Sequence, residues 1–372
     1  MKEIYLDNAA TTKARKEVVN YMVDCMEHSY ANADSIHNLG LSVAKKINEN
    51  KKVFEKLGLP KDSIYFTAGG GEANNILIKA VCNKFKKGRI ISTPIEHPSI
   101  IKTLESLKGF DVCYLKVDEY GRVDENSLKE LLNEDTILVT IAYVNSELGT
   151  IQDIPKLCRI TKEKNKDIVF HTDFVQGLGH VKVDFSKIPV DAVSFSSHKI
   201  YGPKGVGAIY ISKKIKLQPV VYGSNSENAF VPRTLANEQV LGFLKAISLL
   251  DDLDIEHLRE IKEYTLERLK EIPNIRINSP EFSSPGLLNV SFIGARGEII
   301  MNYLSSMNIY VSTGSACSVK KGPSSVIKAI GLEDKYSSGV IRLSFGRYNT
   351  KEDIDEFITQ LNIVLGMIRS VA

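Results

Sequence analysis

Short apolar runs alternate with longer amphipathic stretches along the first two thirds of this chain. The apolar runs are typical of buried strands, and they span residues 89–93, 137–143, 168–171, 192–195 and 206–211. Amphipathic segments typical of helices lie between them, for example at residues 128–133 and 154–164. The alternation predicts an α/β fold, with a mainly parallel sheet that is covered by helices and binds ligands at the carboxyl ends of its strands.

The last third of the chain has a different pattern. A long helical pattern covers residues 241–269, and strand candidates at 288–292 and 340–344 lie on either side of a Gly-rich loop at 313–317. Because 372 residues exceed the usual size of a single core, we expect two domains. We assign residues 15–250 to a large domain, and residues 1–14 with 251–372 to a smaller α+β domain.

The composition excludes several classes of protein. Charged residues make up 25% of the chain and apolar residues 43%, which is typical of a globular protein with a buried core. A net charge of +3 over 372 residues argues against a nucleic-acid partner. The first residues lack the apolar core of a signal peptide, and no stretch approaches the roughly 20 apolar residues of a membrane span. We therefore expect a cytoplasmic protein without a membrane partner.

The chain has five cysteines, which are Cys25, Cys82, Cys113, Cys158 and Cys317. An odd number cannot form a complete disulfide set, and neither cysteines nor histidines show metal-ligand spacing, so we expect a reducing compartment and no metal. Four of the cysteines lie in apolar surroundings, where a free thiol packs as a small core residue. Cys317 differs because the loop around it has almost no apolar bulk.

A Gly-rich turn follows a short predicted strand at residues 63–66 and opens a helix. Gly69, Gly70 and Gly71 are consecutive, so their backbone amides can approach an anion, and the helix N-terminus adds a positive potential that suits a phosphate. A plain tight turn explains three glycines equally well, and the segment lacks the Walker lysine and the dinucleotide-binding spacing. On its own, the turn leaves both interpretations open.

A lysine lies where one predicted buried strand ends. Residues 192–195 lead directly into Ser196, His198 and Lys199, and a Gly-Pro turn follows. A lysine at the end of a buried strand, beside hydroxyls and an imidazole, is suited to lose its proton and react as an amine. A surface lysine at a strand end is the alternative, and this segment alone does not decide between them.

Other polar groups follow neighbouring predicted strands. Asp173 and Gln176 come after one strand, and His97 follows another. A carboxylate at that edge can hold a pyridinium nitrogen protonated, which makes pyridoxal 5′-phosphate (PLP) an electron sink, whereas a helix cap is the alternative role for Asp173. An imidazole such as that of His97 is suited to proton transfer at neutral pH. The pair of Asp173 and Lys199 on successive strands favours a PLP-dependent enzyme.

The order of these motifs resembles the cysteine desulfurases, which belong to the class V aminotransferase group of fold-type I PLP-dependent enzymes. The resemblance covers nearly the whole chain, and it is carried by residues 5–12, 66–75, 96–97, 173–176, 196–205, 314–317 and 341–344. It implies a large PLP-binding domain with a mainly parallel sheet of the seven-stranded type, and a smaller α+β domain that carries a catalytic cysteine loop.

The resemblance assigns a cofactor role to each matching residue. It implies that Lys199 carries PLP as a Schiff base, that Asp173 contacts the pyridine nitrogen and that Gln176 lies near the phenolic oxygen. His97 is implied to stack on the ring and to move protons. The remaining implied cofactor contacts are Gly70, Gly71, Asn145, Ser146, Ser196, His198 and, from the other subunit of a homodimer, Thr234.

The resemblance also implies the reaction. Arg342 binds the carboxylate of the substrate L-cysteine, a task that suits its planar fork of donors. Cys317, on a mobile loop, attacks the substrate sulfur as a thiolate, which yields alanine and a Cys317 persulfide. The persulfide passes its sulfur to an acceptor or scaffold protein, for example in iron–sulfur cluster assembly. A free thiol has a pKa of about 8.5, so a base or cation has to assist; an inert loop thiol is the alternative for Cys317.

Three positions depart from the family's usual pattern. Gly71 replaces a phosphate-binding Thr, which removes a hydroxyl-to-phosphate bond of about 1–3 kcal/mol. Ser146 replaces the second Asn of Asn-Asn-Glu. Residues 231–234, Val-Pro-Arg-Thr, replace Arg-x-Gly-Thr, which keeps Thr234 but moves the arginine to Arg233. These departures concern cofactor affinity and the subunit contact, and they spare the residues on which the chemistry depends.

Two other kinds of function stay open. A selenocysteine or cysteine lyase, or a transaminase, uses the same scaffold, but a transaminase has no need of a loop nucleophile and a lyase tolerates Cys317→Ala. A non-catalytic sulfur-assembly protein would have lost tight PLP binding. Gly71 and Ser146 are compatible with such a protein, and the presence of Lys199 argues against it.

Overall fold

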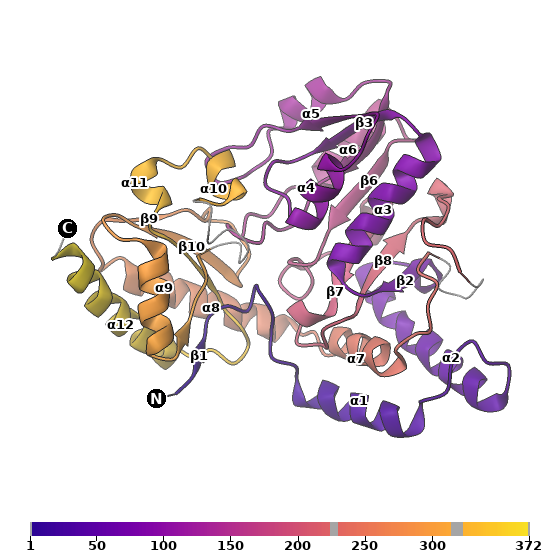
Figure 1. Cartoon of the computed structure of the whole chain (residues 1–372), viewed down its shortest axis with the longest axis horizontal. Helices are drawn as coiled ribbons and strands as arrows, with labels where there is room; N and C mark the ends of the chain where they lie inside the picture. Colours follow the sequence, from indigo (N-terminus) through magenta and orange to yellow (C-terminus); the bar gives the residue numbers. More distant parts are fainter. Residues whose placement is uncertain (1, 224–229, 314–322, 371–372) are drawn as a thin grey trace.

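The computed structural model describes residues 2–223, 230–313 and 323–370, and it forms two lobes that lie side by side (Figure 1). A seven-stranded sheet is the centre of the large lobe. Its strands, in spatial order, are β2 (Ile64–Thr67), β8 (Gly207–Ile211), β7 (Ala192–Ser196), β6 (Val169–Asp173), β5 (Thr136–Thr140), β3 (Gly88–Ser92) and β4 (Phe110–Tyr114). Neighbours from β7 to β4 are parallel, and β8 is antiparallel to both β7 and β2. The prediction of an α/β fold with a mainly parallel sheet is confirmed.

Alternate residues of the central strands pack into two different hydrophobic clusters. Leu138 and Val169 belong to one cluster, whereas their chain neighbours Val139 and Phe170 belong to the other. Successive strand residues point to opposite faces of a sheet, so both faces are buried. The helices of this lobe are α1 (Lys16–His28), α2 (Asn38–Asn50), α3 (Gly70–Phe85), α4 (Pro98–Glu105), α5 (Glu125–Leu131), α6 (Ile154–Lys164) and α7 (Asn237–Ser248).

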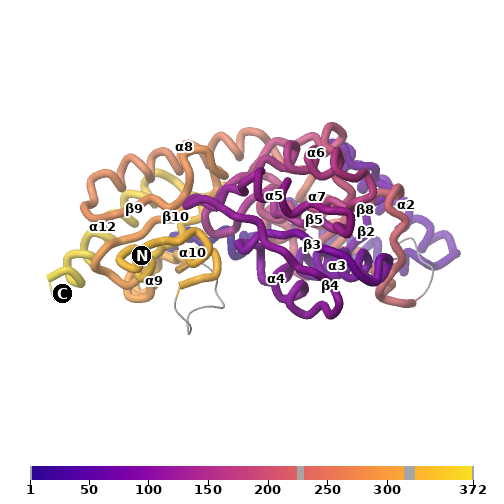
Figure 2. Tube along the Cα trace, turned by 90° about the horizontal axis from the view of Figure 1, so that it is seen from above, coloured from indigo at the N-terminus to yellow at the C-terminus, as the bar shows by residue number. Residues whose placement is uncertain are grey.

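The small lobe has a core of its own, which joins Ile4 and Leu6 to residues of the last third of the chain. The division into residues 15–250 and residues 1–14 with 251–372 stays a prediction, and two side chains cross it, because Ala9 and Leu287 pack with the core of the large lobe. The strands are β1 (Ile4–Tyr5), parallel to β11 (Ile309–Tyr310), and an antiparallel sheet of β12 (Val340–Ser344), β10 (Leu287–Phe292) and β9 (Ile275–Ile277). The helices are α8 (Asp252–Leu269), α9 (Gly297–Ser306), α10 (Ser325–Ala329), α11 (Asp334–Ser337) and α12 (Lys351–Arg369), and α8 runs along the lobe in Figure 2.

Three details of the sequence analysis need correction. The strand β4 was not predicted, because it is a half-exposed edge strand without a buried apolar run. The continuous helical pattern over 241–269 is wrong, since α7 ends at Ser248 and α8 begins after Asp251, whose side chain accepts a hydrogen bond from the amide of Leu253. Cys113 lies on β4 and is partly exposed, whereas Cys25, Cys82 and Cys158 are buried as predicted.

Within the described residues, no helix combines the length and the apolar character needed to cross a membrane.

Candidate active site

The groups predicted from strand ends gather at one edge of the large sheet. Asp173 ends β6, and the neighbouring parallel strand β7 leads into a short 3-10 turn that contains Lys199. His97 follows β3 as the N-cap of α4. Desolvation lowers the pKa of both Lys199 and His97, and the charge of Asp173 opposes this shift in each, which places the three side chains within electrostatic reach of one another.

Lys199 lies in an environment that favours the neutral amine. Its Nζ donates hydrogen bonds to the carbonyl oxygen of Ala10, at 2.8 Å, and to that of Ala9. Burial first, and then the positive charge of Arg342, lower the pKa of Lys199 to about 8 despite the nearby carboxylates. An unperturbed lysine has a pKa of about 10.4, so a far larger fraction of Lys199 is ready to act as a nucleophile or base at neutral pH.

Asp173 is almost completely buried and has a partner for each carboxylate oxygen. Oδ1 accepts a hydrogen bond from the amide of Val175 at 2.9 Å, and Oδ2 accepts one from Asn74 Nδ2 at 2.8 Å. Asn74 belongs to α3, so the helix that begins at the Gly-rich turn also orients this carboxylate. The Oδ1 atom of Asn74 is buried and has no hydrogen-bond partner within the described part of the chain.

The Gly-rich turn forms the N-terminus of α3, and its glycines are not equivalent. A Cβ atom added at Gly70 would lie 2.5 Å from Cγ2 of Val175, so a side chain at this position requires a shift. At Gly71 a Cβ atom would meet Cβ of Ser99 at 3.6 Å, which is an ordinary contact. Ser196 is buried against the turn, 3.6 Å from the Cβ position of Gly70. The close packing at Gly70 fits a cradle of backbone amides for an anion.

Two imidazoles flank the site, and desolvation by the surrounding groups disfavours the charged form of each, although His97 is exposed in the single chain and His198 is half-buried. The pKa of His97 is lowered chiefly by desolvation, and its Nδ1 lies 2.8 Å from Ser99 Oγ. The pKa of His198 is lowered to about 4, first by burial and then by the charge of Lys199, and its Nδ1 lies 3.2 Å from Thr11 Oγ1. His198 is therefore neutral at physiological pH, and Nδ1 of His97 also accepts a hydrogen bond from the amide of Ser99 at 3.1 Å.

Arg342, on β12 of the small lobe, is held from two sides. Its Nη2 donates to Asp7 Oδ1 at 2.8 Å, and its Nη1 donates to the carbonyl oxygen of Ser146 at 3.1 Å. The Nε of Arg342 is buried and finds no hydrogen-bond partner among the described residues. An unsatisfied buried N–H is costly and is therefore uncommon outside functional sites. The remaining donors of this guanidinium suit a carboxylate ligand.

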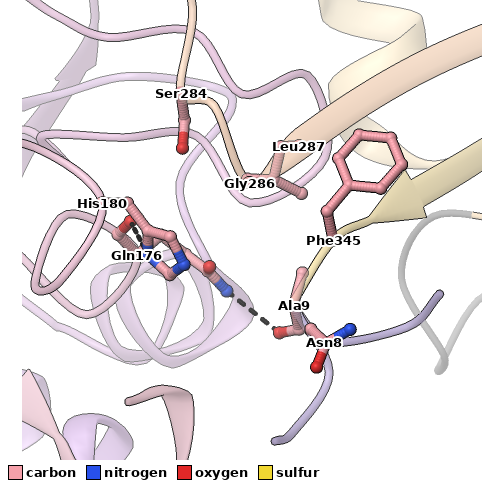
Figure 3. A pocket seen from close by; sticks show the side chains of 8 residues that line it. All are labelled: Asn8, Ala9, Gln176, His180, Ser284, Gly286, Leu287 and Phe345. Carbon is pink, nitrogen blue, oxygen red and sulfur yellow. Dashed lines mark hydrogen bonds between the residues drawn. The ribbon is translucent and has the colours of Figure 1, made fainter. Parts of the chain in front are cut away.

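The segment from Asp7 to Thr12 contacts site residues of both lobes, since Asp7 binds Arg342 and Ala9 binds Lys199. No separate role was predicted for this segment. Ala9 O accepts hydrogen bonds from Lys199 and from Gln176 Nε2, the latter at 3.0 Å. Figure 3 shows the Gln176 amide directed at the Ala9 backbone, beside a narrow recess. The signal in the sequence was a run of small and polar residues next to a two-residue apolar strand, a pattern too short to identify a wall of a site.

Three predicted site residues lie apart from this group or cannot be placed. Asn145 is buried, and its side chain forms hydrogen bonds within a turn. Its Oδ1 accepts hydrogen bonds from the amides of Glu147 and Leu148, and its Nδ2 donates one to the backbone carbonyl oxygen of Ile95. Thr234 is exposed in the single chain. Cys317 lies outside the described residues.

The described residues fit PLP. They combine an amine of lowered pKa, a buried carboxylate, a neutral imidazole and a turn that excludes a side chain at Gly70. The structure describes no group of three or more His, Cys, Asp or Glu side chains that could hold a metal ion.

Comparison with known proteins identifies relatives along the whole chain. The family model for class V aminotransferases matches residues 4–357. Cysteine desulfurase IscS from Dictyoglomus turgidum is 39% identical over 382 residues, which cover 100% of this chain and 96% of that protein. A solved NifS-like protein superposes with a TM-score of 0.93 at 34% identity, covering 98% of this chain and 100% of that one. SspA in complex with cysteine superposes with a TM-score of 0.83 at 29% identity, covering 94% and 100%.

Proposed function

This chain belongs to the cysteine desulfurases of the class V aminotransferase family, and we propose that it takes sulfur from L-cysteine with PLP bound at Lys199. The observation that carries the assignment of the site is the pair on adjacent parallel strands, an amine with a pKa lowered to about 8 and a buried carboxylate. These are the two groups that a PLP enzyme needs at the aldehyde and at the ring nitrogen.

For the cofactor contacts, we propose the residues that the family pattern implies. Lys199 would hold the aldehyde of PLP and Asp173 would hold its ring nitrogen, and the other residues that would contact the cofactor are Gly70, Gly71, Asn145, Ser146, Gln176, Ser196, His198 and the partner subunit's Thr234. When bound, PLP withdraws electrons from the α-carbon of the substrate. The hydrogen bonds from Asn74 and Val175 hold the Asp173 carboxylate in one orientation during the reaction.

Substrate binding and proton transfer fall to residues on both lobes. Arg342 binds the carboxylate of L-cysteine through the donors that Asp7 and Ser146 leave available. Lys199 and His97 move protons at the α-carbon and β-carbon, since the lowered pKa of each side chain favours its neutral form. The related SspA structure with bound cysteine supports this choice of substrate.

Cys317 receives the sulfur in this proposal. Its thiolate attacks the sulfur of the substrate, so that an S–S bond forms as the C–S bond breaks and the β-carbon takes up a proton to give alanine. The resulting persulfide transfers its outer sulfur to an acceptor or scaffold protein, and iron–sulfur cluster assembly is the role that we propose. We further propose a cytoplasmic homodimer, and the exposed position of Thr234 is compatible with a contact to the partner subunit.

The test is alanine formation from L-cysteine by the wild-type chain and by Cys317→Ala, with PLP and a thiol reductant present. We expect alanine from the wild type and almost none from the variant. Equal alanine from both would replace this proposal with a lyase that releases free sulfide. Absence of alanine from both would contradict desulfuration altogether.

A further inference from the structure

An ion pair connects the Gly-rich turn to the segment that departs from the family pattern. Nη2 of Arg233 lies 2.6 Å from Oε1 and 2.5 Å from Oε2 of Glu72. Oε2 of Glu72 also accepts a hydrogen bond from the amide of Ala68 at 2.6 Å. The Glu72 carboxylate therefore links the backbone of the Gly-rich turn, at Ala68, to the side chain of Arg233.

The position of Glu72 is unfavourable for binding an anion. It is the third residue of α3, so its carboxylate lies in the first turn of the helix whose amides at Gly70 and Gly71 are proposed to bind the PLP phosphate. A carboxylate without a counterion there would repel the phosphate. Arg233 supplies the compensating positive charge.

Stability alone gives little reason for this ion pair. The side chains of Arg233 and Glu72 are 35% and 34% exposed, and pairs with this exposure contribute little to folding. The chain also lacks a side-chain hydroxyl at Gly71, so backbone amides and local charge have to provide more of the phosphate affinity.

We infer that Arg233 is a positioning residue for the cofactor phosphate. It neutralises Glu72 and keeps this carboxylate on the Ala68 side of the turn, so that the amides of Gly70 and Gly71 face the phosphate without a competing negative charge. The inference rests on the proposed PLP site and adds to it a residue that compensates for Gly71.

The test is an equilibrium titration of the cofactor-free protein with PLP, for five variants beside the wild type. Arg233→Ala should weaken PLP binding roughly tenfold, because it leaves a carboxylate near a dianion, and the loss should shrink as salt screens that repulsion. Glu72→Gln alone should stay within a few-fold of the wild type. The double variant Arg233→Ala/Glu72→Gln should recover most of the loss.

The matched control is Arg89→Ala. Arg89 also pairs with a carboxylate, Asp111 at 2.7 Å, but it lies near the amino end of β3, away from the strand ends that carry the site. We expect unchanged PLP affinity for this variant. Arg233→Lys, which keeps the charge, should retain affinity within a few-fold. Thermal unfolding of each cofactor-free variant checks that it is folded.

The outcomes separate this inference from the proposed function. If Glu72→Gln weakens binding as much as Arg233→Ala, or if the double variant is worse than either, the pair is only a structural latch and the inference is wrong. An equal loss in Arg89→Ala would have the same meaning. A wild type that fails to bind PLP at Lys199, as seen by mass spectrometry after borohydride reduction, overturns both proposals.

Discussion

The two ends of the proposed cofactor site are built in different ways. At the ring end, Asp173 is 7% exposed and both of its oxygens accept hydrogen bonds from neutral donors. At the phosphate end, Gly71 is exposed and the neighbouring Glu72 is about one third exposed and paired with Arg233. Replacement of a buried, hydrogen-bonded group leaves unpaired polar atoms, whereas an exposed charge can be compensated by another charge nearby. Two of the three departures from the family pattern, Gly71 and Arg233, lie at the exposed end.

The largest expected effect comes from Asp173→Ala. This change removes the charge at the ring and takes away the side-chain acceptor of the Val175 amide and one of the two acceptors of Asn74 Nδ2, which keeps Ser99 Oγ at 3.0 Å. We expect the rate of alanine formation at saturating PLP to fall at least about 100-fold, the usual cost of losing an electrostatic partner in an active site. Gly71→Ala serves as the control and should change the rate by no more than about twofold. A similar rate for the two variants would show that the ring end and the phosphate end tolerate substitution equally.

A second contrast lies within the Gly-rich turn. Gly70→Ala should lower the free energy of unfolding by about 1–3 kcal/mol, because its Cβ would lie 2.5 Å from Val175 Cγ2. Gly71→Ala should be neutral or slightly stabilising, since its Cβ makes only an ordinary contact and Ala is favoured over Gly in helices. Urea denaturation of both cofactor-free variants measures the difference. Equal destabilisation would show that a Cβ atom is as unfavourable at Gly71 as at Gly70.

Gly71→Thr should strengthen cofactor binding. Space at this position admits a side chain, and a hydroxyl that donates to a phosphate is worth about 1.5 kcal/mol, which corresponds to a dissociation constant for PLP roughly tenfold lower. Gly71→Val has the same branched shape without the hydroxyl and should not gain affinity. An equal gain in both variants would assign the effect to helix propensity or packing.

The pH dependence of cofactor uptake tests the environment of Lys199. Burial disfavours the charged amine, so its pKa of about 8 predicts that the neutral form grows as the pH rises toward 8 and saturates above it. The rate of PLP uptake by the cofactor-free protein should rise about fivefold between pH 7 and pH 8 and then level off near pH 9. Stopped-flow absorbance measures this profile. A rate that keeps rising to pH 10 would indicate an unperturbed lysine.

Short patterns in the sequence are sufficient to predict the central buried strands and the functional groups at their ends. The buried strands β5, β6 and β7 appear as short apolar runs, and the chemistry follows directly after them, so Asp173 and Lys199 were identified as neighbours before any contact was known. The edge strand β4 was not predicted, because one side of it faces solvent and its residues need not be apolar.

The amino-acid sequence is sufficient to predict the fold class and the residues of the proposed chemistry, because strand periodicity and the residues at strand ends are encoded within a few positions. The distant groups that orient these residues are identified only in the folded chain. Asp7 reaches Arg342 across 335 positions, and Glu72 reaches Arg233 across 161. The lowered pKa of Lys199 likewise depends on burial by the N-terminal segment and on the charge of Arg342. The contacts of Asp7 and Arg342 form where the two lobes meet, and that of Glu72 with Arg233 forms within the large lobe, so no local pattern specifies either.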